Sequence, residues 1–152
     1  MEIERKFLVK RLPPGWKRAP NSRIRQGYFS LRGQGIEIRV RKKGSEHFIT
    51  IKAGRGTVRR EEEVEISKKC FNVLWPLVCD ASVAKRRYRI PCGRTTIEMD
   101  VYEEAHRGLI TAEVEFESRR ECSSFKPPIW FGREITGNRR YANEVLARRK
   151  HF

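Results

Sequence analysis

Apolar and charged residues alternate along most of this chain. In residues 36–41, which read IEIRVR, every second side chain is apolar and the others are Glu or Arg. Because successive side chains of an extended strand point to opposite faces, such a segment has one apolar face and one ionic face. The pattern predicts a mainly β chain, with about eight strands at residues 2–9, 24–31, 36–42, 47–53, 60–66, 84–90, 95–102 and 109–117.

Short turn sequences separate several of these strands. Clusters such as Lys43-Gly44-Ser45 and Pro91-Cys92-Gly93 favour hairpins, and hairpins join antiparallel strands. About eight strands is the number at which a closed barrel can hold one small ligand. The pattern therefore allows a closed eight-stranded antiparallel β-barrel or a β-sandwich, of the mainly β (α+β) class, with flanking helices at residues 67–77 and 138–149 and an irregular connector at 127–132.

Composition narrows the class of protein. The 152 residues are expected to form one domain, residues 1–152, and no apolar run reaches the length that spans a membrane. The first 20 residues lack the apolar core of a secretory signal, so a cytoplasmic location is expected. The four cysteines show no C-x-x-C spacing, which argues against zinc and redox sites. The scattered histidines His47, His106 and His151 are expected at the surface.

A formal net charge of +15 indicates an anionic partner. Basic clusters at residues 41–43, 85–87 and 148–150 could contact phosphates. The chain has no helix-turn-helix pattern, zinc finger or aromatic ribonucleoprotein motif. A peripheral contact with nucleic acid or long polyphosphate is therefore a hypothesis separate from any enzymatic site. No membrane partner is expected, and the chain is expected to be a monomer or a homodimer.

The ionic faces are sorted by sign from strand to strand. Carboxylates pair in some strands and cations in others: Glu2 with Glu4, Glu61 with Glu63, Glu98 with Asp100 and Glu113 with Glu115, against Arg39 with Arg41 and Lys85 with Arg87. Two architectures accommodate this pattern. Either the apolar faces form the interior and the charges meet water, or the ionic faces line a central tunnel whose apolar outside is covered by the helices. A randomly solvated surface has little reason to separate the signs, so the segregation favours the tunnel.

Charges inside a barrel are costly unless each finds a partner. A divalent metal held by the carboxylates, together with a polyphosphate held by the cations, satisfies both sets. Oxygen ligands favour Mg²⁺ or Mn²⁺ over zinc, and arginine suits bidentate contacts with phosphate. In the opening strand, Glu2 and Glu4 are thus expected to be metal ligands and Lys6 a phosphate contact.

The residues resemble the CYTH superfamily, also called the triphosphate tunnel metalloenzymes. The segment EIERK at residues 2–6 matches the family signature E-x-E-x-K. It is followed in order by RQGY (25–28), IEIRVR (36–41), TIK (50–52), EEE (61–63), KRRY (85–88), EMD (98–100) and EVEF (113–116). The closing segment at residues 130–147 is similar to the short bacterial branch, so the resemblance covers essentially the whole chain.

The resemblance implies an eight-stranded antiparallel tunnel that hydrolyses inorganic tripolyphosphate to pyrophosphate and phosphate. Tyr28 and Lys52 look like the tyrosine-lysine dyad of the family. Carried over position by position, the metal side would comprise Glu2, Glu4, Glu61, Glu63, Asp100, Glu113 and Glu115, and the substrate side Lys6, Arg39, Arg41, Lys52, Lys85 and Arg87.

Phosphoryl transfer needs an activated nucleophile and neutralised charge on the transferred group. We expect Tyr28 to accept a proton, with the charge of Lys52 favouring its phenolate. The alternative is that Tyr28 only forms a hydrogen bond across the tunnel. Three alternative functions stay open: a class IV-type adenylyl cyclase, a hydrolase of nucleoside or thiamine triphosphate, and a polyphosphate-binding module without catalysis.

Overall fold

The computed structural model describes residues 2–30, 35–53 and 60–149. Its strands form one sheet in the order β5-β4-β3-β2-β6-β7-β8-β1-β9, and all neighbouring strands are antiparallel. The strands are β1 (Ile3–Val9), β2 (Asn21–Tyr28), β3 (Ile36–Lys43), β4 (Glu46–Ala53), β5 (Arg60–Glu65), β6 (Ser82–Cys92), β7 (Thr95–Tyr102), β8 (Ile110–Phe116) and β9 (Phe131–Glu134). The mainly β, antiparallel class expected from the alternation is confirmed.

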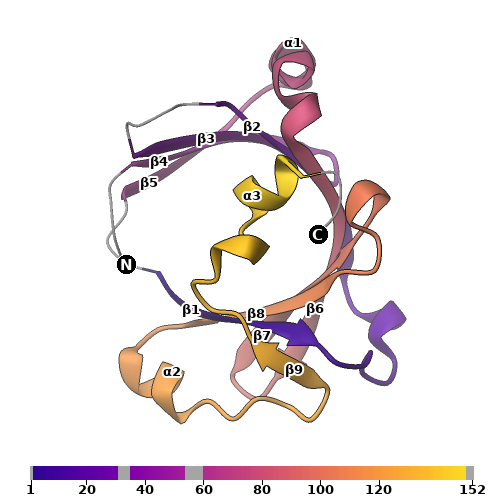
Figure 1. Ribbon diagram of the computed structural model, residues 1–152, viewed down its shortest axis with the longest axis vertical. Helices are drawn as coiled ribbons and strands as arrows, with labels where there is room; N and C mark the ends of the chain where they lie inside the picture. Colours follow the sequence, from indigo (N-terminus) through magenta and orange to yellow (C-terminus); the bar gives the residue numbers. More distant parts are fainter. Residues whose placement is uncertain (1, 31–34, 54–59, 150–152) are drawn as a thin grey trace.

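The sheet curls around a central space but does not close (Figure 1). Among the described residues β5 and β9 are the two edges, and no ladder joins them. The expected closed eight-stranded barrel is therefore wrong in both strand number and closure. Crowding of carboxylates from β5, β7 and β8 and the start of the chain opposes a closer approach of these strands. Partial burial and the nearby Glu2, Glu98 and Glu61 raise the pKa of Glu115, so bringing β5 against β8 and β1 would press like charges together.

Two elements near the end of the chain were not anticipated. β9 pairs with β1 through Phe7 opposite Glu134 and Val9 opposite Phe131, where an irregular connector was expected. The short helix α2 (Arg119–Ser124) begins at its N-cap Ser118. A strand of 4 residues and a helix of 6 are too short to show a period. Among the strand predictions, residue 31 lies outside the described residues.

Helix α1 (Lys68–Val78) starts where the sequence predicts. The Ser67 side chain accepts a hydrogen bond from the Cys70 backbone N–H at 3.0 Å and so caps the first turn. The helix covers the apolar outer face of β2, β3 and β4, where Phe71 and Val78 pack with Val40.

The second predicted helix is divided. Its residues form the 3₁₀ turn η4 (Arg139–Tyr141) and the helix α3 (Asn143–Ala147), because Ala142 between them is extended, with φ −66° and ψ 135°. α3 lies within the curl of the sheet (Figure 1). The remaining 3₁₀ turns are η1 (Trp16–Arg18), η2 (Cys79–Ala81) and η3 (Glu104–His106).

The apolar faces lie outside the curl and the ionic faces inside it. The segment that contains α2 and β9 covers a second apolar cluster, in which Phe7, Ile97 and Val114 are fully buried. The inner face buries Lys85 and Asp100 instead, at 0% and 1% exposure. Of the two architectures that the alternation allowed, the one with inward charges is correct. No helix of the described residues is long and apolar enough to cross a membrane.

The expected surface position is wrong for two of the histidines. His47 is buried beside Phe71, with ring centroids 4.9 Å apart. His106 is buried, and its Nε2 lies 2.6 Å from the carbonyl oxygen of Leu146 and 2.9 Å from that of Arg149. His106 therefore ties η3 to the C-terminal segment. His151 lies outside the described residues.

Candidate active site

Strand register brings the predicted site residues onto one continuous inner face. Because facing residues in neighbouring strands share a face, each pair in the register extends the same row of side chains. Starting from β1, the pairs are Lys6 with Glu113, Glu113 with Glu98, Glu98 with Arg89, Asp100 with Arg87, Tyr102 with Lys85, Gln26 with Arg41, Tyr28 with Arg39, Glu37 with Lys52, Lys52 with Glu61 and Thr50 with Glu63.

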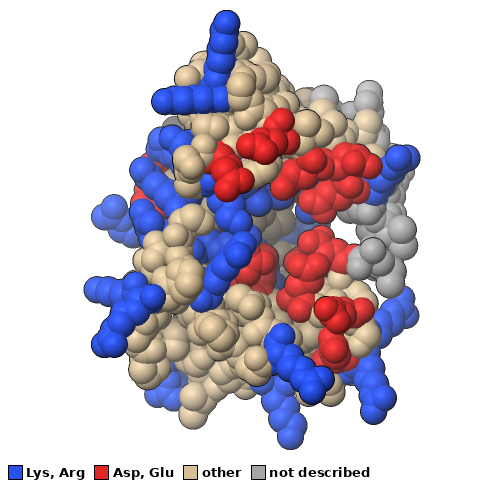
Figure 2. All heavy atoms as spheres, turned by 180° about the vertical axis from the view of Figure 1, so that it is seen from behind, with Lys and Arg blue, Asp and Glu red and all other residues tan. Residues whose placement is uncertain are grey.

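Carboxylates gather at the opening of the curl. Figure 2 shows acidic side chains on two sides of a hollow, with basic side chains adjoining it. Partial burial and the neighbouring carboxylates of Glu113 and Glu2 raise the pKa of Glu4 to about 7. This crowding of like charge marks the acidic side as a place where a cation would be stabilised.

A cavity of about 640 Å³ adjoins this acidic side. Tyr28, Lys52 and Lys6 line it together with Glu2, Glu4 and Glu113. Residues of η4 and the start of α3, including Tyr141 and Asn143, line it as well. Two cations and three carboxylates predicted to act on substrate and metal, together with the proposed proton acceptor, therefore border one space.

A buried ion network lies on the inner face of β6 and β7. Lys85 Nζ lies 2.7 Å from Asp100 Oδ2, and Arg87 binds the same carboxylate through Nε at 2.7 Å from Oδ1 and Nη2 at 2.9 Å from Oδ2. Burial alone would raise the pKa of Asp100, but Lys85 and Arg87 hold it well below its usual range. Asp100, predicted as a metal ligand, thus has both of its carboxylate oxygens bound by cations.

Arg87 connects this network to the carboxylates of the neighbouring strands. Its Nη1 lies 2.8 Å from Glu98 Oε2, and its Nη2 lies 3.9 Å from Glu113 Oε2. Lys85 is fully buried, so a phosphate can reach its ammonium group only if its surroundings open. Arg87, at 9% exposure, is the more accessible of the two cations.

Tyr28 is held by polar groups of β2 and β3. The Gln26 amide donates to the Tyr28 hydroxyl at 2.7 Å, and Arg41 Nε donates to Gln26 Oε1 at 2.9 Å. Burial raises the pKa of Tyr28, while the charge and hydrogen bond of Arg39 oppose this rise. Arg39 also has a buried Nε without a hydrogen-bond partner among the described residues.

Lys6 and Lys52 lie where the acidic and basic side chains of the inner face meet. Lys6 Nζ lies 3.4 Å from Glu113 Oε1 and donates to the Tyr141 carbonyl oxygen at 2.9 Å. Lys52 Nζ lies 3.9 Å from Glu61 Oε2. The cation that contacts Tyr28 is Arg39, whereas Lys52 shares only the cavity with it. The role of Lys52 as activator of Tyr28 stays a prediction.

Sequence reasoning gave no site role to several polar residues of the inner face, among them Gln26, Glu98 and Asn143. Gln26 could have been found, because it lies two residues before Tyr28 and so shares its face. Glu98 shares a face with Asp100 but was left out of the proposed ligands. Asn143 carries no periodic signal, since it enters the site from a helix rather than from the sheet.

The donor set fits a divalent cation. Among the described residues, no group of three or more His, Cys, Asp or Glu side chains is close enough together to hold a metal ion. Mg²⁺ in phosphoryl-transfer sites is usually bound by one or two carboxylates, with substrate phosphates and water completing the shell. Partial burial, Glu113 and Glu2 raise the pKa of Glu4 to about 7 even though Lys52 and Lys6 oppose the rise, so the nearby cations do not fully offset the crowding of the carboxylates.

This crowding predicts a pH-dependent penalty in chelator. In the unfolded chain the Glu4 carboxyl has its ordinary pKa, whereas in the folded protein its pKa is about 7. Ionised Glu4 therefore lowers the free energy of unfolding, and this loss of stability grows as the pH rises from the ordinary pKa to about 7. In EDTA, the free energy of unfolding of Glu4→Gln should therefore exceed that of the wild type by about 1 kcal/mol at pH 8, a figure reduced for solvent screening. At pH 4 the two proteins should be equally stable. Urea unfolding at the two pH values measures this difference.

Glu46→Gln is the control for that experiment, because Glu46 is an exposed residue in the β3–β4 hairpin. It gives the effect of removing a carboxylate outside the site. If Glu4→Gln is no more stable than the wild type at pH 8, the carboxylates around Glu4 do not repel one another as the geometry indicates.

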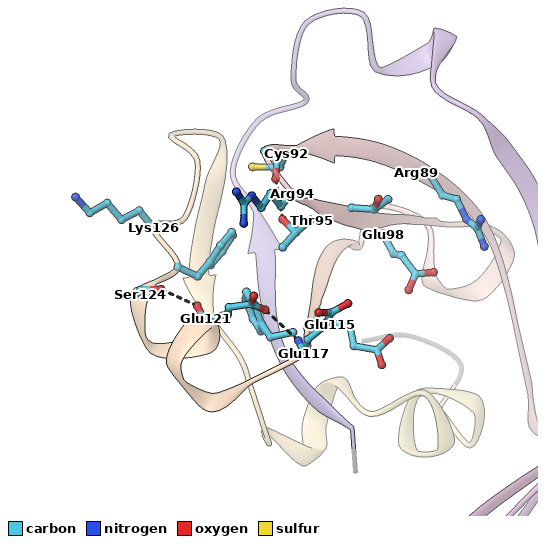
Figure 3. Close-up of a pocket in the computed structure, with 14 residues that line it drawn as sticks. Arg89, Cys92, Arg94, Thr95, Glu98, Glu115, Glu117, Glu121, Ser124 and Lys126 are labelled. Carbon is cyan, nitrogen blue, oxygen red and sulfur yellow. Dashed lines mark hydrogen bonds between the residues drawn. The ribbon is translucent and has the colours of Figure 1, made fainter.

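A second and larger cavity, about 1350 Å³, lies beside the β6–β7 hairpin and α2. Figure 3 shows Lys126 at one end and Arg89 at the other, with acidic side chains between them. Glu98 and Glu115 line it, so it adjoins the ionic inner face. Tyr28 and Lys52 line only the smaller of these two cavities, which is therefore the better candidate for the chemistry.

Comparison with known proteins agrees with this geometry. The CYTH domain family matches residues 1–139. An inorganic triphosphatase of Nitrosomonas europaea is 41% identical over 148 residues, covering 96% of each chain. An inorganic triphosphatase of Acetivibrio thermocellus is 33% identical over 150 residues, covering 97% of this chain and 93% of its own. A crystal structure of an inorganic triphosphatase superposes with a TM-score of 0.78 at 37% identity, covering 98% of this chain and 95% of that one.

Proposed function

The chain belongs to the CYTH family, and we propose that it is a metal-dependent triphosphatase that hydrolyses inorganic tripolyphosphate to pyrophosphate and phosphate. The observation that carries this function is the 41% identity to an inorganic triphosphatase across nearly the whole of both chains. The inner face supports it chemically, because cations and carboxylates border one cavity. We also propose that residues 1–152 form a single CYTH domain, with the inner face of the curled sheet as its working site.

Tripolyphosphate carries charge on every phosphoryl group, and its transfer is catalysed mainly by positioning and charge neutralisation. In our proposal Arg39, Arg41 and Arg87 bind phosphate oxygens, since guanidinium groups suit bidentate contacts. Lys6 and Lys52, which both line the cavity, add point charge. Lys85 is fully buried and contacts Asp100 and Asn143 of α3. It is proposed as the sixth member of this substrate-binding set.

CYTH triphosphatases are generally metal-dependent. We propose Mg²⁺ or Mn²⁺, held by carboxylates of the opening: Glu2, Glu4, Glu61, Glu63, Glu113 and Glu115. Such an ion would neutralise charge on phosphate oxygens and acidify a bound water. Asp100 belongs to the predicted ligand set too, but its two oxygens already bind Lys85 and Arg87.

Tyr28 is the proposed proton acceptor, and Lys52 the proposed contact and activator. The Tyr28 hydroxyl oxygen accepts from Gln26, and the charge of Arg39 lies nearby. Both cationic charge and donated hydrogen bonds favour the phenolate over the phenol. A substrate that brings Lys52 toward Tyr28 would add to this effect.

A substrate panel separates the possible activities. Tripolyphosphate, ATP, thiamine triphosphate and pyrophosphate are incubated with enzyme in Mg²⁺ or Mn²⁺, and phosphate and cyclic AMP are measured. We expect tripolyphosphate to give the highest kcat/KM, with no cyclic AMP from ATP. Cyclic AMP as the main product would favour the cyclase, and binding without turnover would favour a polyphosphate-binding module.

We also propose a peripheral contact with nucleic acid or long polyphosphate, and a monomer or homodimer located in the cytoplasm.

A further inference from the structure

The side chain of Asn143 enters the inner face from the first turn of α3. Its Oδ1 accepts a hydrogen bond from the Tyr102 hydroxyl at 2.6 Å and lies 3.4 Å from Lys85 Nζ. Both partners are buried, Tyr102 at 2% exposure and Lys85 at 0%. This contact joins the last helix of the chain to the ion network of β6 and β7.

The chemistry of the donors fixes how the amide is turned. An ammonium group only donates hydrogen bonds, so the oxygen of Asn143 and not its nitrogen must face Lys85. The Tyr102 hydroxyl has a single proton, and it is donated to the same oxygen. Rotating the amide would leave buried donors without a partner, which costs free energy. The Asn143 oxygen is therefore held in one orientation.

Lys85 in turn shares an oxygen of Asp100 with the guanidinium group of Arg87, whose Nη2 lies 3.9 Å from Glu113 Oε2 at the edge of the smaller cavity. Asp100 Oδ2 lies 2.7 Å from Lys85 Nζ and 2.9 Å from Arg87 Nη2. A shift of the ammonium group would therefore displace the carboxylate that orients Arg87. The order of contacts is Tyr102, Asn143, Lys85, Asp100 and Arg87.

We propose that Asn143 is a positioning residue of the triphosphatase site, whose amide oxygen fixes Lys85 and, through Asp100, the guanidinium group of Arg87. The proposal rests on the proposed function, because Arg87 is taken to bind phosphate. It makes α3 part of the substrate-binding machinery rather than a cover over one end of the sheet. The oxygen of Asn143 acts through cations that bind phosphate, so its loss weakens substrate binding more than it slows chemistry.

A double-mutant cycle with Asn143→Leu and Lys85→Met tests this coupling. Leucine is close to asparagine in size but lacks the acceptor. KM for tripolyphosphate should increase about tenfold in Asn143→Leu, the effect of one hydrogen bond to a charged group, with kcat within about threefold of the wild type. In the Lys85→Met background the same substitution should change KM less than about twofold. Asn72→Leu, on the exposed side of α1, is the matched control.

Equal increases of KM in both backgrounds, or a fall in kcat alone, would overturn the role of Asn143. The dissociation constant of tripolyphosphate, measured by calorimetry, replaces KM for any variant that is inactive. Tyr102→Phe provides a second cycle if Lys85→Met does not fold, and its effect should not add to that of Asn143→Leu. A wild type that binds tripolyphosphate without hydrolysing it would refute the proposed function, while the calorimetric cycle would still decide the role of Asn143.

Discussion

Replacing Asp100 by asparagine should destabilise the protein by about 3–5 kcal/mol, the usual cost of leaving a buried charge without its partner. Asp100 is 1% exposed and binds two cations, Lys85 at 2.7 Å and Arg87 at 2.7 Å. Asparagine keeps the size of the side chain but removes the charge that balances them. Urea unfolding at pH 7 measures the loss, and tripolyphosphate hydrolysis should fall with it because Arg87 loses its bidentate partner.

Glu98→Gln is the matched control. Glu98 lies two residues away on the same strand and the same face, and it contacts Arg87 at 2.8 Å, but its side chain is 29% exposed. Water can replace its contact, so the expected loss is below about 1 kcal/mol. If the two variants lose the same stability, burial does not govern the energetics of this network.

Tyr28→Phe should reduce kcat about 100-fold while KM changes little, which is the size of effect expected from a lost proton acceptor. The hydroxyl is the only group removed, and it accepts from Gln26 at 2.7 Å. Burial raises the pKa of Tyr28, so the phenol predominates at neutral pH and the phenolate fraction increases as the pH rises toward that pKa. In the wild type kcat should therefore increase with pH, and this increase should be lost in the variant. Steady-state kinetics at several pH values measures both effects.

Tyr88→Phe is the control for this substitution. Tyr88 lies on the opposite face of β6 from Lys85 and Arg87 and packs edge-on against Trp16, with ring centroids 4.9 Å apart. Removal of the Tyr88 hydroxyl group should leave kcat and the pH dependence of kcat unchanged. Activity of Tyr28→Phe within threefold of the wild type would reduce Tyr28 to a packing residue.

Much of the site could be predicted because alternation is a local property. Once residues 2–6 and 98–100 are recognised as strands, the face shared by Glu2, Glu4 and Lys6, or by Glu98 and Asp100, follows from backbone geometry. The pairing of strands, by contrast, depends on residues that lie far apart in the sequence, such as those of β1 and β8. The separation of signs nevertheless anticipated the inward ionic face, because buried charges must find partners of the opposite sign.

The remaining features depend on tertiary structure. Nothing in the order of residues indicates that Asp100 pairs with Lys85 and Arg87, since this follows from the register of β6 and β7. Whether the sheet closes depends on how all of its strands pair, and among the described residues the unpaired edges are β5 and β9. The break at Ala142 and the inward path of Asn143 are invisible to periodicity, because five residues of helix are too few to define a face.

The most direct measurement is phosphate release from tripolyphosphate in Mg²⁺ or Mn²⁺ and then in EDTA, for the wild type, Glu4→Gln and Lys52→Ala. Our account predicts rapid release by the wild type that stops in EDTA, and a loss of about 100-fold or more in both variants, because one belongs to the acidic side and the other to the basic side of the same cavity. Release that continues undiminished in EDTA, or in both variants, would contradict a metal-dependent site on the inner face of the sheet.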